Sequence, residues 1–174
     1  RLQQRAREAE LRARLHALQA RANPHFLFNS LNTVAGLVAD DPERAERVLE
    51  RLSGLYRHVL ERSQAERIRL DEEMAAVRDY LEIEAIRLGS RLRYTVDCDP
   101  ATLSALVPPM VLQPLVENAV LHGVASRREG GSVRVSARRD GDTLALAVED
   151  DGPGPGGSAR KGTGQSLQDL RDRL

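Results

Sequence analysis

Apolar side chains recur at helical spacing through the first third of the chain. Residues 1–22 are otherwise polar, and their apolar positions step by four and three residues, at Leu11, Leu15, Leu18 and Ala22. A narrow seam of this kind is typical of a helix that pairs with another helix. A solvated single helix is the alternative, but a polar helix with one thin seam is only marginally stable by itself, so we expect pairing.

Pro24 interrupts or kinks this helix, and beyond it the apolar stripe changes face. The new stripe keeps helical spacing and consists of Leu27, Leu31, Val34 and Val38. At about 100° per residue, small and polar residues form a second stripe on the opposite side, at His25, Asn29, Asn32 and Gly36. We therefore expect His25 to lie on a face that the core does not cover.

A further helix is predicted from Asp41-Pro42, an N-cap followed by a first helical position, to about Arg62. Its apolar face consists of Val48, Leu52, Leu55 and Val59. One hairpin of two helices leaves part of both stripes in water, whereas two copies can form a four-helix bundle. The sequence thus predicts an N-terminal helical domain, residues 1–64, that forms a homodimer through residues 1–62.

The remainder, residues 65–174, mixes helices and strands. Residues 63–69 form a polar connection, and Asp71 is expected to cap a third helix that ends at Gly89. The stripe of this helix contains Met74, Val77 and Leu81, with Ile83 or Ala85 as further members. Alternation of apolar and polar residues then predicts a strand over Leu92–Cys98.

Pro108-Pro109 is expected to open a fourth helix, which buries Leu112, Leu115, Val116 and Ala119. Residues 132–138 and 143–149 then read as two strands, and Asp140-Gly141-Asp142 between them predicts a hairpin. Density in glycine and proline makes residues 150–164 a loop, and a last helix is expected over residues 165–174. The fold class is α+β, with antiparallel strands.

Composition narrows the possible functions. The charges balance at 26 against 26, which argues against direct nucleic-acid binding. One cysteine, Cys98, excludes an intrachain disulfide and a Cys/His zinc site, and it fits a reducing cytosolic compartment. We find no apolar run of 18 residues that would span a membrane and no signal peptide. Because the chain begins at Arg1 in helical pattern, we expect it to be a fragment.

Three motifs carry candidate chemistry. The first, Asn23 to Asn32, reads NPHFLFNSLN and places His25 opposite the leucine stripe. A helical histidine is more often structural, but an exposed and neutral imidazole with one free nitrogen is a competent nucleophile. The proline before it also leaves local backbone groups free.

The second motif, QPLVENAVLHG, runs from Gln113 to Gly123. Asn118 and His122 are four residues apart on one helix face, and Glu117 lies beside them. A carboxamide, a carboxylate and an imidazole on one rim could bind Mg²⁺ and phosphate. By itself the pattern favours the simpler interpretation, a helix with a wet polar side.

The third motif joins DDGPG, which begins at Asp150 after a strand, to GTG at residues 162–164, before a helix. A carboxylate at a strand end can accept a hydrogen bond from the adenine amine, and glycines let the backbone approach a ligand. The N-terminus of the following helix, with Lys161 and Arg160 beside it, suits phosphate. A flexible surface loop is the alternative, and neither a Walker A loop nor a dinucleotide fingerprint is present.

All three motifs occur in the order seen in LytS-type sensor histidine kinases, which this chain resembles from about Leu18 to Leu174. The first resembles the phosphoacceptor box of that family and the second its N box. DDGPG and GTG resemble the glycine boxes of the GHKL (Bergerat) ATP-binding fold. Further matches are LYR at residues 55–57, LDEE at residues 70–73, YLEIE at residues 80–84, and Arg87.

This resemblance implies an ATP-dependent protein-histidine kinase of a two-component system. His25 would be the phosphorylated residue, Asn118 would hold Mg²⁺, and Glu117 and His122 would line the phosphate end. Asp150 would bind adenine, while the pocket and its lid would be formed by Gly152, Gly154, Lys161, Gly162, Thr163 and Gly164. The implied partners are a second copy of the chain and a response regulator with an acceptor Asp. The implied location is cytoplasmic, downstream of a membrane-anchored sensor segment.

The chain departs from the family pattern at three places. Phe26 follows the histidine where many other histidine kinases carry an acidic base, so the proton acceptor is unassigned. Gln165 and Ser166 replace the usual apolar residue and glycine, and Asp169 stands where Asn is usual. The chain stops at Leu174, so we expect the sheet to lack its last strand. An inactive dimerising scaffold with the same fold is therefore an alternative; another GHKL ATPase or serine kinase is a second, but it gives no reason for the phosphoacceptor box.

Overall fold

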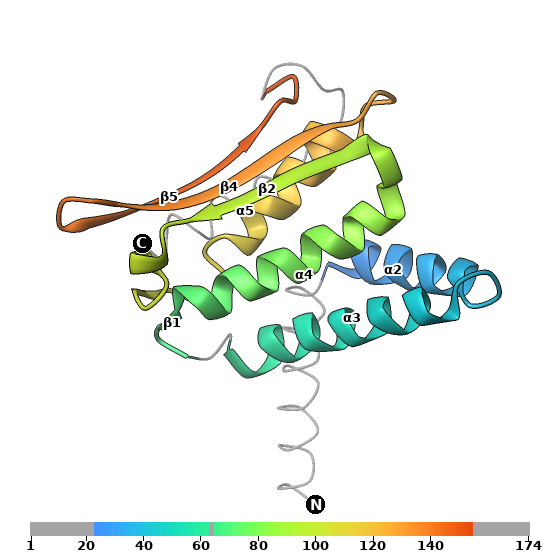
Figure 1. Ribbon diagram of the computed structural model, residues 1–174, viewed down its shortest axis with the longest axis horizontal. Coiled ribbons are helices and arrows are strands. Elements are labelled where there is room, and N and C mark those ends of the chain that lie inside the picture. The colour runs from blue at the N-terminus through green and yellow to red at the C-terminus, as the bar shows by residue number, and fades with distance from the viewer. Residues whose placement is uncertain (1–22, 63–64, 155–174) are drawn as a thin grey trace, which may run out of the picture.

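The computed structural model describes residues 23–62 and 65–154. Three long helices come first along this part of the chain: α2 (Pro24–Leu37), α3 (Pro42–Arg62) and α4 (Leu70–Leu88). They lie side by side, and α4 packs against both of the others. Figure 1 shows α2 and α3 on one side of α4 and the sheet on its other side.

The main sheet has three strands, β2 (Leu92–Cys98), β4 (Gly131–Asp140) and β5 (Thr143–Asp150), in the order β2-β4-β5. Its inner face packs on α4 and on a π-helical segment, Ala119–Ala125, which continues the helix α5 (Gln113–Asn118). Along the strands, inward positions that are buried or half-buried alternate with more exposed outward ones, as the sequence pattern predicts. Short elements complete the fold: β1 (Ile68–Arg69) paired with β3 (Leu106–Val107), and 3-10 turns at Gly89–Arg91 and Pro100–Thr102.

Buried apolar residues form one cluster that reaches from Phe26 in α2 to Ala137 in β4. The centre of this cluster is α4, whose residues Met74, Val77, Leu81 and Ile83 are all fully buried. Since α4 faces the helices on one side and the sheet on the other, the helical part and the α+β part share their packing. The orientation of the candidate site relative to α2 is therefore fixed by side-chain contact.

Local chemistry sets several boundaries where the sequence predicts them. The carboxylate of Asp41 accepts from the backbone N–H of Arg44 at 3.0 Å, and α3 begins at Pro42. Gly89, with φ of 60°, ends α4. Asp140 pairs with Thr143 across a two-residue turn that begins at Gly141, whose φ is 59°. These predictions are confirmed.

The prediction that Asp71 caps α4 was wrong. The helix begins at Leu70, and its N-cap is Arg69, which belongs to β1. The Leu70 N–H donates to the carbonyl of Ala105 at 2.8 Å, so pairing with the segment at β3 fixes the helix start. The connection is also less polar than expected, because Ile68 is buried. Asp71 lies in the first turn and accepts from the Arg69 guanidinium at 2.6 Å.

Pro108-Pro109 does not open the fourth helix, contrary to expectation. The helix α5 begins at Gln113, and Met110 before it has a φ of 58°, which breaks a continuous helix. The carboxylate of Glu73 holds this turn, accepting from the backbone N–H groups of Met110 at 3.0 Å and Leu112 at 2.9 Å. The helix start is therefore set by a residue from α4, far away in the sequence.

The expectation of purely antiparallel strands also needs correction. Strand β2 pairs with β4 in parallel, with Val96 opposite Val135, whereas β4 and β5 are antiparallel. The reason is the long connection between β2 and β4, which carries α5 and returns the chain to the same end of the sheet.

The inward face of α2 differs from the predicted stripe. Its buried residues are Phe26, Ser30 and Val34, whereas Leu31 is 44% and Val38 57% exposed. The α3 stripe agrees with the prediction, since Val48, Leu52, Leu55 and Val59 are all buried. They are covered within one chain by α2 and α4. A second copy of the chain is therefore not needed to bury the apolar stripe of α3. The leucine seam before Asn23 and the predicted last helix lie outside the described residues.

Candidate functional site

His25 lies in the first turn of α2, and its side chain is exposed. Asn23 is the N-cap: its carboxamide oxygen accepts from the backbone N–H of Phe26 at 3.2 Å, and Pro24 follows as the first helical residue. Phe26 points the other way, into the core, where its ring centroid lies 4.8 Å from that of Tyr80. The expected separation of His25 from the core is confirmed, although Phe26 rather than the leucine stripe anchors the turn.

Asn29 is the neighbour of the His25 ring. Its carboxamide nitrogen lies 3.2 Å from Nδ1 and 3.4 Å from Nε2 of the imidazole, one turn further along α2. A carboxamide at this distance can orient a neutral imidazole, with roles that depend on the tautomer. The ring is thus open to solvent and held from one side.

The N box occupies α5 and the π-helical segment after it. Asn118 ends α5 and is exposed, while His122 lies within the π-helical segment and is half-buried. A short π-helical stretch within a helix is frequently found at functional sites. The hydroxyl of Ser126 donates to the carbonyl of His122 at 2.7 Å, which helps to end the helix just beyond the box.

The DDGPG segment begins where β5 ends, and it packs on the end of the N box. The Gly152 N–H donates to Asp150 Oδ1 at 2.9 Å, which turns the chain sharply. A Cβ atom on Gly123 would lie 2.5 Å from that same oxygen, and a Cβ on Gly152 would lie 2.5 Å from the Gly123 Cα. The two motifs therefore meet in space, and their glycines are required by the closeness of that contact.

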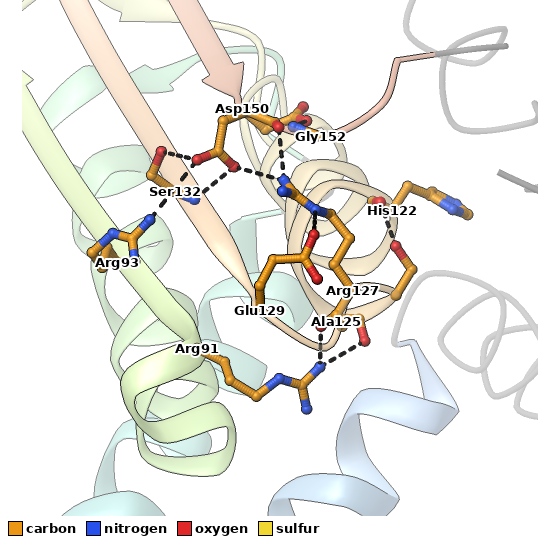
Figure 2. Close-up of polar contacts among 11 residues, drawn as sticks. Arg91, Arg93, His122, Ala125, Arg127, Glu129, Ser132, Asp150 and Gly152 are labelled. Atoms are coloured by element: carbon orange, nitrogen blue, oxygen red, sulfur yellow. Dashed lines mark hydrogen bonds and ion pairs between the residues drawn. The ribbon is translucent and has the colours of Figure 1, made fainter. Parts of the chain in front are cut away.

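Asp151 fixes this loop to the sheet and to the segment after the N box. Its carboxylate accepts from the backbone N–H of Ser132 at 2.9 Å and from the Ser132 hydroxyl at 2.8 Å. Arg127 donates to the Asp151 carbonyl at 2.8 Å and to Glu129 at 2.9 Å, as Figure 2 shows around the Arg127 side chain. The hydrogen bonds from Ser132 and the nearby arginines lower the pKa of Asp151.

Arg91 supports the same region from below. Its guanidinium donates to the carbonyl of Ala125 at 3.0 Å and to that of Arg127 at 2.7 Å, both drawn in Figure 2. These carbonyls lie at and just beyond the C-terminal end of the π-helical segment, where free acceptors remain. A cation at a helix C-terminus is favourable, so Arg91 holds the end of the N box in place.

Glu117 does not share the solvent-exposed rim with Asn118. It lines a small pocket between α2, α3 and α5, together with Asn23 and Tyr56. Gln113 donates to its Oε1 at 3.0 Å. The Asn23 side chain lies in the same pocket and acts as a second hydrogen-bond partner on the pKa of the carboxylate. Burial raises the pKa of Glu117, while these two hydrogen bonds act in the opposite direction. Burial also raises the pKa of Tyr56, and the charge of Glu117 adds to that shift.

Metal binding would have to rely on few protein ligands. Within residues 23–62 and 65–154, no group of three or more His, Cys, Asp or Glu side chains could hold a metal ion. The exposed carboxamide of Asn118 could supply one oxygen ligand. This suits Mg²⁺, which commonly keeps several waters and is held by one or two protein groups plus substrate phosphates.

Comparison with known proteins places the chain in a family. The profile described as "Histidine kinase" matches residues 13–92. The chain is 36% identical over 173 residues to the Sensor protein LytS of Staphylococcus haemolyticus, covering 93% of this chain and 30% of that relative. The chain belongs to the LytS-type histidine kinases.

Other LytS-type relatives agree. The chain is 34% identical over 174 residues to the Sensor histidine kinase/phosphatase LytS of Staphylococcus aureus, covering 93% of this chain and 30% of the relative. It is 36% identical over 148 residues to the Sensor histidine kinase YpdA of Escherichia coli, covering 85% of this chain and 26% of that protein. The chain thus spans less than a third of the length of these relatives.

A solved structure offers only a loose likeness. The histidine kinase domain of a blue-light activated histidine kinase from Erythrobacter litoralis is 19% identical, with a TM-score of 0.47, covering 96% of this chain and 84% of that one.

Within the part of this LytS-type chain that the structure describes, no helix is long and apolar enough to cross a lipid bilayer.

The structure brings only some of the predicted site residues together. Asp150 and Gly152 meet the N box at Gly123, with Gly154 two residues further on, whereas His25 lies on a separate helix. Lys161, Gly162, Thr163 and Gly164 lie outside the described residues. Sequence reasoning missed Asp151, although the doubled aspartate was a signal, and it missed Glu73, Arg91 and Arg127, whose roles depend on contacts between distant segments.

Proposed function

We propose that this chain is the ATP-dependent protein-histidine kinase core of a two-component system, and that it phosphorylates its own His25. The observation that carries the proposal is the placement of His25. In a chain of the LytS type, this histidine is exposed in the first turn of a helix whose cap and core anchor are both fixed. The ring takes no part in core packing and has Asn29 beside it, so it is open to a phosphate donor.

The nucleotide would be bound by the part that begins at residue 65, with a GHKL (Bergerat) type of fold. We assign adenine recognition to Asp150, whose carboxylate lies beside the Gly123–Gly152 contact, and loop closure to Gly152 and Gly154. Asn118 and His122 would face the phosphates, with Lys161 and the 162–164 glycine segment completing the site. Asn118 would hold Mg²⁺, which neutralises phosphate charge when bound.

Phosphoryl transfer from ATP to His25 would require one covalent step of the chain, attack by the histidine. A nitrogen of His25 would form the bond to the γ-phosphorus while the bond from that phosphorus to the bridging oxygen breaks, so that ADP leaves. Positioning and charge neutralisation would supply most of the rate enhancement. Asn29 would orient the imidazole for attack in line with the leaving oxygen.

The proposal includes partners and location. The phosphate would pass to an acceptor Asp of a response regulator, and the chain would lie on the cytoplasmic side of a membrane-anchored sensor. We further propose a homodimer through residues 1–62 of the helical part. The structural support for this dimer is a set of large apolar side chains that a single chain leaves exposed. They are Phe28, Leu31 and Val38 on one face of α2, and Leu49 and Leu60 on α3. Light scattering tests this assembly. At tens of micromolar protein, a dimer with a Kd of about 1 μM would be mostly assembled, so a chain that stays monomeric would contradict the proposal.

The decisive experiment incubates the chain with radiolabelled ATP and Mg²⁺. Phosphohistidine is labile in acid and stable in base, so the label on the protein should be lost in acid and kept in base. Label that resists acid would point to a hydroxyl acceptor and contradict the proposal. Nucleotide binding without any label would favour the inactive dimerising scaffold.

A further inference from the structure

The cap of the His25 helix lies against the N box, because Asn23 and Glu117 line the same pocket. Asn23 uses its carboxamide oxygen to accept from the Phe26 N–H, at 3.2 Å. Its side chain also lines the same small pocket as Glu117, where it serves as a hydrogen-bond partner that lowers the pKa of the carboxylate. A carboxylate only accepts, so the Asn23 Nδ2 group must be the donor. The carboxamide of Asn23 therefore contacts the first turn of α2 through its oxygen and Glu117 of α5 through its nitrogen.

The surroundings make this bridge hard to replace. Glu117 is also held by Gln113, at 3.0 Å, and both line a pocket whose other walls include Tyr56, Leu55 and Met110. The Tyr56 hydroxyl and Gln113 Oε1 are buried and have no hydrogen-bond partner among residues 23–62 and 65–154. A polar group buried here depends on specific neighbours, so the orientation of the Asn23–Glu117 pair is determined by the pocket.

We propose that Glu117 is a positioning residue for His25, which it reaches through Asn23. The inference rests on the proposed function, and it gives the N-box glutamate a role other than contact with phosphate. Asn118, the next residue, is exposed to solvent, while Glu117 lines the pocket beside the helix cap. Adjacent residues of α5 thus connect the nucleotide boxes to the turn that carries the acceptor.

The geometry explains why the contact matters for transfer. His25 is two residues after Asn23, and Phe26 is anchored on Tyr80 at 4.8 Å. The first turn is consequently held on its inner side by Phe26 and at its start by the Asn23–Glu117 bond. Loss of the bond leaves the inner anchor in place but frees the start of the turn, and small errors in placement of reacting groups lower phosphoryl-transfer rates strongly.

Reversal of the hydrogen-bond polarity tests this role in the complete 174-residue chain. Asn23→Asp keeps an oxygen that caps Phe26 but places a carboxylate against Glu117. Glu117→Gln leaves a carboxamide that can accept from Gln113 with its oxygen. In the double variant, the new amide at position 117 donates to the new carboxylate at position 23, so the bond is restored with donor and acceptor exchanged. Asn23→Ser is the matched control, because serine keeps the cap but is too short to reach Glu117.

At saturating ATP, Asn23→Asp should lower the rate of acid-labile label incorporation by about tenfold or more, the loss expected for one charge-assisted hydrogen bond. Glu117→Gln and Asn23→Ser should show smaller losses, and the double variant should recover most of the rate lost in Asn23→Asp. Fluorescent-nucleotide titration should give ATP affinities within about threefold of wild type for the Asn23 variants, since a factor of three is well under one kcal/mol. A general structural defect would not be rescued by a second substitution.

A wild-type rate in Asn23→Asp, or a double variant no faster than Asn23→Asp, would overturn the inference. Circular dichroism establishes that each variant is folded. If the wild type carries no acid-labile label, the proposed kinase activity fails separately. Hydrogen exchange at the Phe26 amide then tests the bridge: faster exchange in Asn23→Asp and recovery in the double variant would support it, and unchanged exchange would contradict it.

Discussion

Replacement of Glu73 by glutamine should destabilise the chain strongly, although the two side chains are nearly the same size. The Glu73 carboxylate is 1% exposed and accepts backbone N–H bonds from Met110 at 3.0 Å, Leu112 at 2.9 Å and Gln113 at 3.4 Å. Both oxygens are used. Glutamine keeps one oxygen and presents an N–H₂ group where an acceptor is required, so at least one buried backbone donor loses its partner.

The magnitude follows from these bonds. A hydrogen bond to a charged group contributes about 1.5–3 kcal/mol, and a buried donor without a partner costs about 1–3 kcal/mol. Allowing for partial relaxation of the turn, we expect Glu73→Gln to lower the free energy of unfolding by about 3 kcal/mol. His58 of α3, whose Nε2 lies 3.7 Å from Glu73 Oε2, would lose its neighbouring charge as well.

Urea denaturation at 25 °C, followed by circular dichroism, measures this effect. The midpoint should fall with little change in slope, because the surface exposed on unfolding stays the same. Glu46→Gln, the same change at an exposed position of α3, is the control and should shift stability by less than about 0.5 kcal/mol. If Glu73→Gln were as stable as that control, Glu73 would not hold the start of α5.

Three further predictions concern the loop at the end of β5. Asp150→Asn should weaken ATP binding by about 1.5–3 kcal/mol with little effect on folding; unchanged affinity by calorimetry would remove Asp150 from the adenine site. Gly123→Ala should destabilise the fold by about 1–3 kcal/mol, since the new Cβ would lie 2.5 Å from Asp150 Oδ1; an unaltered thermal midpoint would contradict that packing. The pKa of Asp151 is lowered by Ser132, so its stabilising contribution is present above the unfolded pKa of about 3.9 and is lost as pH falls through the lower folded value. The stability difference between wild type and Asp151→Asn should therefore shrink in acid, and a difference independent of pH would be evidence against the Asp151–Ser132 contact.

The elements that sequence reasoning placed correctly are those decided by neighbours in the chain. Asp41 caps α3 and Gly141 turns the hairpin because each acts within a few residues. The inward face of α2 was offset because an amphipathic helix does not say which residue its partner will cover. The partner helix is α4, where the Tyr80 ring packs against Phe26 and so turns that residue toward the core.

In the candidate site, too, features set by neighbouring residues were predictable, and features set by distant contacts were not. The glycine and aspartate boxes were recognisable as motifs, and their meeting at Gly123 agrees with that pattern. The position of Glu117 was not predictable, because α5 begins at Gln113 only when Glu73 holds the preceding turn. Periodicity alone put Glu117 on a wet rim; contact with α2 and α3 puts it in a pocket beside Asn23.

Comparison of the wild type with His25→Ala tests the central claim most directly. Both proteins would be incubated with radiolabelled ATP and Mg²⁺, and their affinity for ATP would be measured in parallel. Because His25 lies on α2, away from the loop at Asp150, the variant should bind ATP nearly as the wild type does but incorporate no acid-labile phosphate. Acid-labile labelling that persists in His25→Ala would show that another residue accepts the phosphate and would contradict the account.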